Sequence, residues 1–179
     1  MRLLIIPDKF KGSMTSEEVY QSFKQGVEKV ISDASFHFVK ASDGGDGFLD
    51  AISTYRECDE IEMETLDPLG RKISSYYLYD QKNESAYIEL ANSSGMELLE
   101  PSERNASLTS TYGSGQQIND AIKRGAKKVY VGLGGSATND GGTGIANALG
   151  FEFTDTKGHS LEPIGKNLSQ IQDIRNPRK

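Results

Sequence analysis

A glycine-rich loop at residues 132–142 (GLGGSATNDGG) carries the residue types best suited to holding a phosphate group. Glycine lets the backbone approach a ligand closely, and converging N–H groups beside a helix N-terminus bind anions. The expected donors are Gly134, Gly135, Ser136, Thr138, Asn139, Gly141 and Gly142. Asp140 adds a carboxylate that suits Mg²⁺ or accepts a hydroxyl proton. The alternative is a tight connection whose polar residues only cap the next helix.

The same loop partly fits a dinucleotide-binding fingerprint. Gly132, Gly134 and Ala137 match G-x-G-x-x-A after a strand, and Asp155 lies near the place of a ribose-binding acid. The fingerprint requires a helix to start inside the motif, where Gly141 and the glycine after it would cost about 2 kcal/mol of helix propensity. A dinucleotide-binding oxidoreductase is therefore the weaker interpretation.

A second loop, SDGGDG at residues 42–47, places two acids around two glycines after a predicted strand. Ligands of open α/β sheets bind at the carboxyl ends of strands. Asp43 and Asp46 are therefore candidates for binding Mg²⁺ or a substrate hydroxyl. A turn with an aspartate cap is the alternative interpretation.

A third loop, PDKFKGS at residues 7–13, follows the first predicted strand. Asp8 stands at the end of that strand, and Lys9 and Lys11 place positive charge beside it. A lysine here could contact a carboxylate or a transferring phosphoryl group, although a solvated lysine pair is also consistent with the sequence. We expect all three loops to share one rim of the fold.

The elements that must position these loops show two patterns. Strand, loop and helix alternate over residues 3–55 and again over 114–154, which predicts parallel strands flanked by helices. Thr15 and Glu18 have capping-box spacing at the start of the first helix. Between these parts, residues 60–66, 72–79 and 85–91 alternate as strands joined by the turns DPLG and QKNE.

The fold class that these patterns predict is α/β. We expect a mostly parallel sheet flanked by helices, with an antiparallel strand meander in the middle. The predicted segments are an α/β part at 1–56, the meander at 57–92 and an α/β part with the glycine-rich loop at 93–179. Residues 92–112 are expected to be mostly loop, and Arg104 within them is a candidate partner for an anionic substrate.

Composition limits the possible partners of the chain. The net charge of −6 over 179 residues argues against broad binding of nucleic acid or anionic membranes, while local donors still allow an anionic small substrate. The single cysteine, Cys58, allows no disulfide within these residues and no cysteine metal cluster. We therefore expect a reducing, cytoplasmic location, and no apolar run approaches the length of a membrane span.

Six segments in register resemble the glycerate kinase type I family along essentially the whole chain. They are IIPDKFKGSMTSEEV, ASDGGDG, DPLGR, IELANSSGMELL, ERN with TSTYGSGQQI, and VGLGGSATNDGGTGIANALG. The resemblance implies a kinase that uses ATP and Mg²⁺ to phosphorylate a hydroxyl of D-glycerate. It also implies an α/β protein of two domains with the active site in the cleft between them.

The resemblance suggests roles for residues in all three loops. Asp8 or Asp43 would activate the hydroxyl, and Lys11 would lie near anionic oxygens as part of the catalytic group. Substrate binding is assigned to Ser13, Asp46 and Arg104. The loop from Gly134 to Gly142 would surround phosphate, with Asp140 near the metal.

Members of that family are about twice as long as this sequence, and the motifs of their C-terminal half are absent from it. We therefore expect a fold that is incomplete relative to the family and a chain with weak or no kinase activity by itself. The alternatives are an inactive remnant and a split-protein subunit, through self-association or a complementary C-terminal chain.

Overall fold

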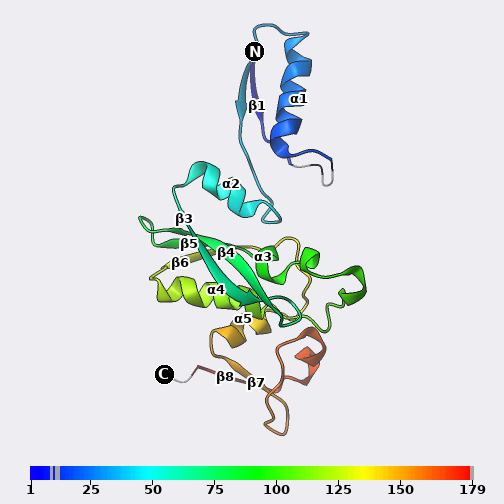
Figure 1. The fold of residues 1–179 in the computed structure, drawn as a ribbon, viewed down its shortest axis with the longest axis vertical. Coiled ribbons are helices and arrows are strands. Elements are labelled where there is room, and N and C mark those ends of the chain that lie inside the picture. The colour runs from blue at the N-terminus through cyan, green and yellow to red at the C-terminus, as the bar shows by residue number, and fades with distance from the viewer. Residues whose placement is uncertain (9, 11–12, 178–179) are drawn as a thin grey trace. The chain divides into compact units, whose positions relative to one another are not determined.

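The computed structural model describes residues 1–8, 10 and 13–177, and the chain divides into two compact units, Met1–Asp43 and Gly44–Lys179. Figure 1 shows the helices and strands of both units. The predicted segment boundaries at 56/57 and 92/93 stay predictions.

The first unit is a β-α-β arrangement of β1 (Arg2–Ile5), α1 (Ser16–Glu28) and β2 (Ser35–Phe38). The two strands pair in parallel, as the alternation of elements predicts. Thr15 caps α1: its hydroxyl accepts from the Glu18 N–H at 3.2 Å, while the Glu18 carboxylate accepts from the Thr15 N–H at 2.7 Å. The predicted capping box is therefore confirmed. The Tyr20 ring of α1 stacks on Phe38 of β2 at 4.8 Å.

The second unit is built on a mixed four-stranded sheet. Its strands, in spatial order, are β3 (Asp59–Leu66), β4 (Lys72–Asp80), β5 (Ser85–Glu89) and β6 (Lys128–Gly132). The pairs β3–β4 and β4–β5 are antiparallel and form the predicted meander, whereas β5 and β6 are parallel. The mixed α/β class, with parallel and antiparallel strands flanked by helices, agrees with the sequence prediction.

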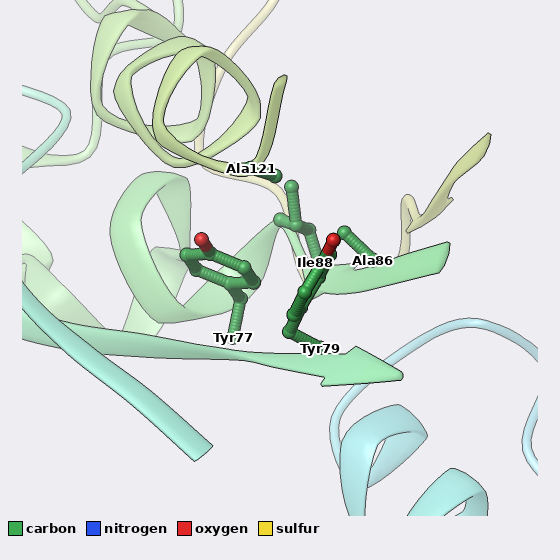
Figure 2. Packing of buried hydrophobic residues seen from close by; sticks show 5 residues of the cluster. All are labelled: Tyr77, Tyr79, Ala86, Ile88 and Ala121. Carbon is green, nitrogen blue, oxygen red and sulfur yellow. The ribbon is translucent and has the colours of Figure 1, made fainter. Parts of the chain in front are cut away.

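Helices cover both faces of this sheet (Figure 1). On one face, α4 (Tyr112–Lys123) packs over a core of Tyr77, Tyr79, Ala86, Ile88 and Ala121, which Figure 2 shows in close-up. On the other face, α2 (Phe48–Tyr55) contributes Leu49 to a second cluster with Leu78 and Tyr87. Strand residues alternate between the two faces, so both helices bury apolar side chains against one sheet.

Short helices occupy a region that the sequence predicts to be mostly loop. They are α3 (Ala91–Ser94), η1 (Met96–Leu98) and η2 (Pro101–Glu103), so β5 ends at Glu89 and the predicted strand over 85–91 is too long. These helices have too few residues to show a 3.6-residue period.

Buried hydroxyl groups fix α3 against α4. The Ser114 Oγ lies 2.9 Å from the Ser93 Oγ and 2.8 Å from the Ser94 Oγ. Ser93 also donates to the Gln117 Oε1 at 3.2 Å, and the Gln117 amide donates to the Tyr76 carbonyl of β4 at 2.9 Å. Because all of these hydroxyls and the amide are buried and partnered, they hold α3, α4 and the sheet in one fixed register.

The chain then continues through α5 (Thr143–Ala148), β7 (Glu152–Thr154), η3 (Gly165–Gln170) and β8 (Asp173–Arg175). The helix and β7 were predicted, whereas η3 and β8 were not. β7 and β8 form an antiparallel pair separate from the main sheet. Over the described residues, the longest helices are too short and too polar to cross a lipid bilayer.

Candidate functional site

The candidate site lies at the carboxyl ends of β5 and β6, the parallel pair of the sheet. Glu89 of β5 is the register partner of Gly132 of β6, so the two strands end side by side. α3 follows the first strand and the glycine-rich loop follows the second. This edge is where open α/β sheets place their ligands.

Hydrogen bonds to α3 and its flanking residues hold the glycine-rich loop in place. The Ala137 N–H donates to the Ser94 carbonyl at 2.9 Å, and the Met96 N–H donates to the Gly135 carbonyl at 2.9 Å. The Thr109 hydroxyl donates to the Ala137 carbonyl at 2.8 Å. The loop is therefore anchored along its length by a segment that is itself fixed to α4.

The part of the D-G-G-D-G loop that lies in the second unit meets the glycine-rich loop directly. The Gly134 N–H donates to the Gly44 carbonyl at 2.9 Å. A Cβ at Gly134 would collide with the Gly45 Cα, so only glycine allows this approach. Two loops nearly 90 positions apart in the sequence thus share one rim, as predicted for residues 44–47.

Several donors of the glycine-rich loop are available to a ligand. The backbone N–H groups of Gly135, Asn139 and Gly141 donate to no acceptor among the described residues, and all three residues are exposed. The hydroxyls of Ser136 and Thr138 lie 2.8 Å apart, and the Thr138 N–H donates to the Ser136 Oγ at 3.0 Å. Exposed N–H groups next to hydroxyls form a donor set that suits an anion such as phosphate.

Asp140 is buried at the base of the loop and is 2 % exposed. Its Oδ2 accepts from the Thr111 N–H at 2.8 Å, the Thr111 hydroxyl at 2.9 Å and the Gly144 N–H at 3.1 Å. Its Oδ1 accepts from the Gly142 N–H at 3.0 Å. The carboxylate therefore joins the loop to the N-cap residue of α4 and to the first turn of α5.

These contacts bear on the predicted metal role of Asp140. Four protein donors already occupy its oxygens, which fits a residue that positions the loop better than a direct ligand of Mg²⁺. Over the described residues, no group of three or more acidic, histidine or cysteine side chains is placed to hold a metal. The metal role of Asp140 stays a prediction.

Glu89 is a site residue that the sequence interpretation missed. It is 6 % exposed, and its Oε1 and Oε2 accept from the N–H groups of Gly47 at 3.3 Å and Leu49 at 3.2 Å. Burial raises the pKa of the Glu89 carboxyl, the two N–H groups oppose that rise, and the nearby Asp46 adds to it. An acid at the end of an otherwise apolar strand was the available signal.

Of the remaining predicted site residues, Asp46 and Arg104 lie in the second unit. Asp46 is exposed in the turn beside Glu89. Arg104 is also exposed, and its Nε donates to the Leu99 carbonyl at 3.3 Å. Asp8, Ser13 and Asp43 belong to the first unit, so their roles stay predictions. Lys11 lies outside the described residues.

The geometry disfavours the dinucleotide interpretation of the glycine-rich loop. α5 begins only at Thr143, well after Ala137, so no helix starts inside the G-x-G-x-x-A motif. Asp155 instead closes a local turn, because its Oδ1 accepts from the N–H groups of Lys157 at 2.8 Å and His159 at 2.9 Å.

Fold and site together define an α/β protein with glycine loops at the carboxyl ends of its strands, an arrangement suited to a small anionic ligand. The model of the glycerate kinase family matches residues 3–178. The chain belongs to the glycerate kinase family.

Individual relatives agree with this assignment. The chain is 34 % identical to glycerate 2-kinase of Escherichia coli K12 over 174 residues, which cover 97 % of this chain and 46 % of that protein. It is 36 % identical to glycerate kinase of Haemophilus influenzae, over 97 % of this chain and 45 % of the relative. A crystal structure from Salmonella typhimurium LT2, assigned as a glycerate kinase 2, superposes with a TM-score of 0.77 at 33 % identity and covers 97 % of this chain. The chain spans about half the length of the curated relatives it matches.

Proposed function

We propose that this chain carries part of the site for ATP-dependent phosphorylation of a hydroxyl group of D-glycerate, giving phosphoglycerate. One observation carries the proposal. This chain belongs to the glycerate kinase family, and its loops at 44–47 and 132–135 meet backbone to backbone at the carboxyl ends of parallel strands. That rim presents the donors that a phosphoryl group requires.

Phosphoryl transfer depends mainly on positioning and on neutralising negative charge. In the proposal, the exposed N–H groups of Gly135, Asn139 and Gly141 bind phosphate oxygens of ATP. Asp43 or Asp8 accepts the proton of the attacking hydroxyl. The proposed contacts to the anionic oxygens and to the substrate come from Lys11, Ser13, Asp46 and Arg104.

ATP and Mg²⁺ are part of the proposal. Mg²⁺ would neutralise phosphate charge during transfer. The donors of the glycine-rich loop fit the phosphates, whereas the four hydrogen bonds of Asp140 favour a supporting role for its carboxylate over direct coordination. The effect of Mg²⁺ on the Tm of the wild type and of Asp140→Asn separates the two roles.

The relatives named glycerate kinase are about twice as long as the matched region, so the rate at which this chain turns over is part of the proposal. We infer that this chain alone turns over weakly and that a second polypeptide, or a second copy of the chain, supports full turnover in the cytoplasm. Size-exclusion chromatography at several concentrations checks for self-association.

The test is a coupled assay of ADP release with ATP, Mg²⁺ and D-glycerate, run beside calorimetric titration of each ligand. The expected result is measurable binding of ATP and D-glycerate with turnover far below that of the full-length E. coli relative. Turnover equal to that relative would contradict the weak activity. Failure to bind either ligand would contradict the proposed function itself.

A further inference from the structure

Glu89 caps a helix to which it is not adjacent in the sequence. α2 has no side-chain cap of its own, and its N-cap position is Gly47, with a φ of +90°. The Glu89 carboxylate, some 40 positions further along the chain, accepts the N–H groups of Gly47 and Leu49 instead. It satisfies donors that the first turn of a helix otherwise leaves to water.

Burying the Glu89 carboxylate costs free energy, because the charged group is removed from water. Glu89 is 6 % exposed, and the described structure gives it no lysine or arginine partner. The two N–H groups and the positive end of the α2 dipole are what compensate its charge. An apolar side chain could fill the same space but could not accept the N–H groups of Gly47 and Leu49.

Glu89 holds one end of the D-G-G-D-G turn. The other end is held by the bond from the Gly134 N–H to the Gly44 carbonyl, and Gly45 is buried against Gly134. Between these two fixed points lies Asp46, which therefore has little freedom to move its backbone. The turn cannot shift away from the glycine-rich loop while both anchors remain.

We propose that Glu89 is a positioning residue for substrate binding: it fixes the 44–47 turn so that Asp46 is held at the rim where the hydroxy acid binds. This inference rests on the proposed function, because it assigns the small hydroxy acid to the turn. It adds a residue and a contact that act through Asp46 without touching the substrate.

The chain contains a matched control for this role. Asp80 is a second buried carboxylate, 3 % exposed, that accepts turn hydrogen bonds from the Asn83 N–H at 2.9 Å and the Asn83 Nδ2 at 2.7 Å. Asp80 ends β4 and also pairs with Arg56, the C-cap of α2, at 4.0 Å, but it has no bond to the rim among the described residues. A general loss of stability therefore affects Glu89→Gln and Asp80→Asn alike, whereas loss of positioning affects only the first.

The experiment measures amide hydrogen exchange and D-glycerate affinity in the wild type, Glu89→Gln and Asp80→Asn. Glutamine offers one acceptor oxygen where the carboxylate offers two, so one N–H of α2 loses its partner. Exchange at Gly47 and Leu49 is expected to rise about tenfold, the D-glycerate Kd to rise about tenfold and the ATP Kd to change less than about twofold. Asp80→Asn should raise exchange only near its own turn and around Arg56 at the C-terminal end of α2, and leave the D-glycerate Kd unchanged.

Each contrary result has a distinct meaning. Unchanged exchange at Gly47 and Leu49 overturns the anchoring, and faster exchange with a normal D-glycerate Kd overturns the positioning. If the wild type binds no D-glycerate, the proposed function fails, while the exchange measurement still decides the anchoring. Should Glu89→Gln not fold, Glu89→Asp keeps the charge but shortens the reach by one methylene, and the same pattern is expected with a smaller amplitude.

Discussion

Replacing Asp140 by asparagine tests how the glycine-rich loop is held. The Asp140 carboxylate accepts four hydrogen bonds, three at Oδ2 and one at Oδ1, and is 2 % exposed. Asparagine has one acceptor oxygen. In its best orientation it keeps the three bonds at the Oδ2 position and turns its NH₂ group toward the Gly142 N–H.

The expected loss follows from these contacts. A buried donor left without an acceptor costs about 1–3 kcal/mol, and the bonds that remain lose the strength that a charged acceptor gives them. We expect the free energy of unfolding to fall by about 3 kcal/mol. For a chain of this size, that corresponds to a decrease in Tm of about 6–12 °C.

Asp155→Asn is the matched control for this substitution. The Asp155 carboxylate also accepts two turn N–H groups, from Lys157 and His159, but its side chain is 24 % exposed and water can replace the lost acceptor. The expected loss is below about 1 kcal/mol. Thermal unfolding followed by circular dichroism compares the two variants with the wild type.

Two results would refute this reasoning. If Asp140→Asn is no less stable than Asp155→Asn, the four contacts do not clamp the loop. If instead the variant keeps its stability and Mg²⁺ raises the Tm of the wild type but not of the variant, Asp140 is a metal ligand, as the sequence first suggested.

Three further predictions concern the rim and its acids. Gly134→Ala places a Cβ against the Gly45 backbone and should lower the free energy of unfolding, measured in urea, by about 1–3 kcal/mol. Gly26→Ala in α1 has open space around the new Cβ and should not lower it. Equal losses in the two variants would contradict the close approach. Asp43→Ala should lower D-glycerate-dependent ADP release about 10²-fold or more in the coupled assay, and a near-normal rate would remove Asp43 as the hydroxyl activator. Burial raises the pKa of the Glu89 carboxyl above its usual 4.5, so over this pH range the folded state keeps a proton that the unfolded state releases. The free energy of unfolding should therefore fall as pH rises from about 4.5 through the raised pKa. A Glu89→Gln variant that shows the same fall would exclude Glu89 as its source.

The sequence predicted the elements whose signals are local. Thr15 and Glu18 are three residues apart and form the predicted capping box, because that motif depends only on its own residues. The turn residues before Arg71 and after Asp80 likewise separate the three strands of the meander where expected. Regular alternation and turn chemistry act over a few residues, so they can be read directly from the chain.

The features that sequence reasoning missed depend on contacts between distant residues. Glu89 ends a predicted apolar strand, which signals an unusual acid, but its neighbours do not show that its carboxylate accepts from the N–H groups at the start of α2. Asp140 was assigned to metal because a carboxylate in a glycine-rich loop suits Mg²⁺, and its neighbours in the sequence do not show that this carboxylate accepts from the hydroxyl of Thr111, the N-cap of α4. The short helices after Glu89 are stabilised by buried hydroxyls such as Ser93 and Ser114, and have no period of their own.

The central claim is that the 44–47 turn and the glycine-rich loop form one ligand rim. The most direct test is an NMR titration of the backbone amides of the ¹⁵N-labelled chain with ATP and Mg²⁺, followed by D-glycerate. We predict that the largest shift changes on nucleotide addition fall on Gly135, Asn139 and Gly141, and that D-glycerate then shifts the amides of residues 44–47. Shift changes confined to other parts of the chain, or none at saturating ligand, would contradict the claim.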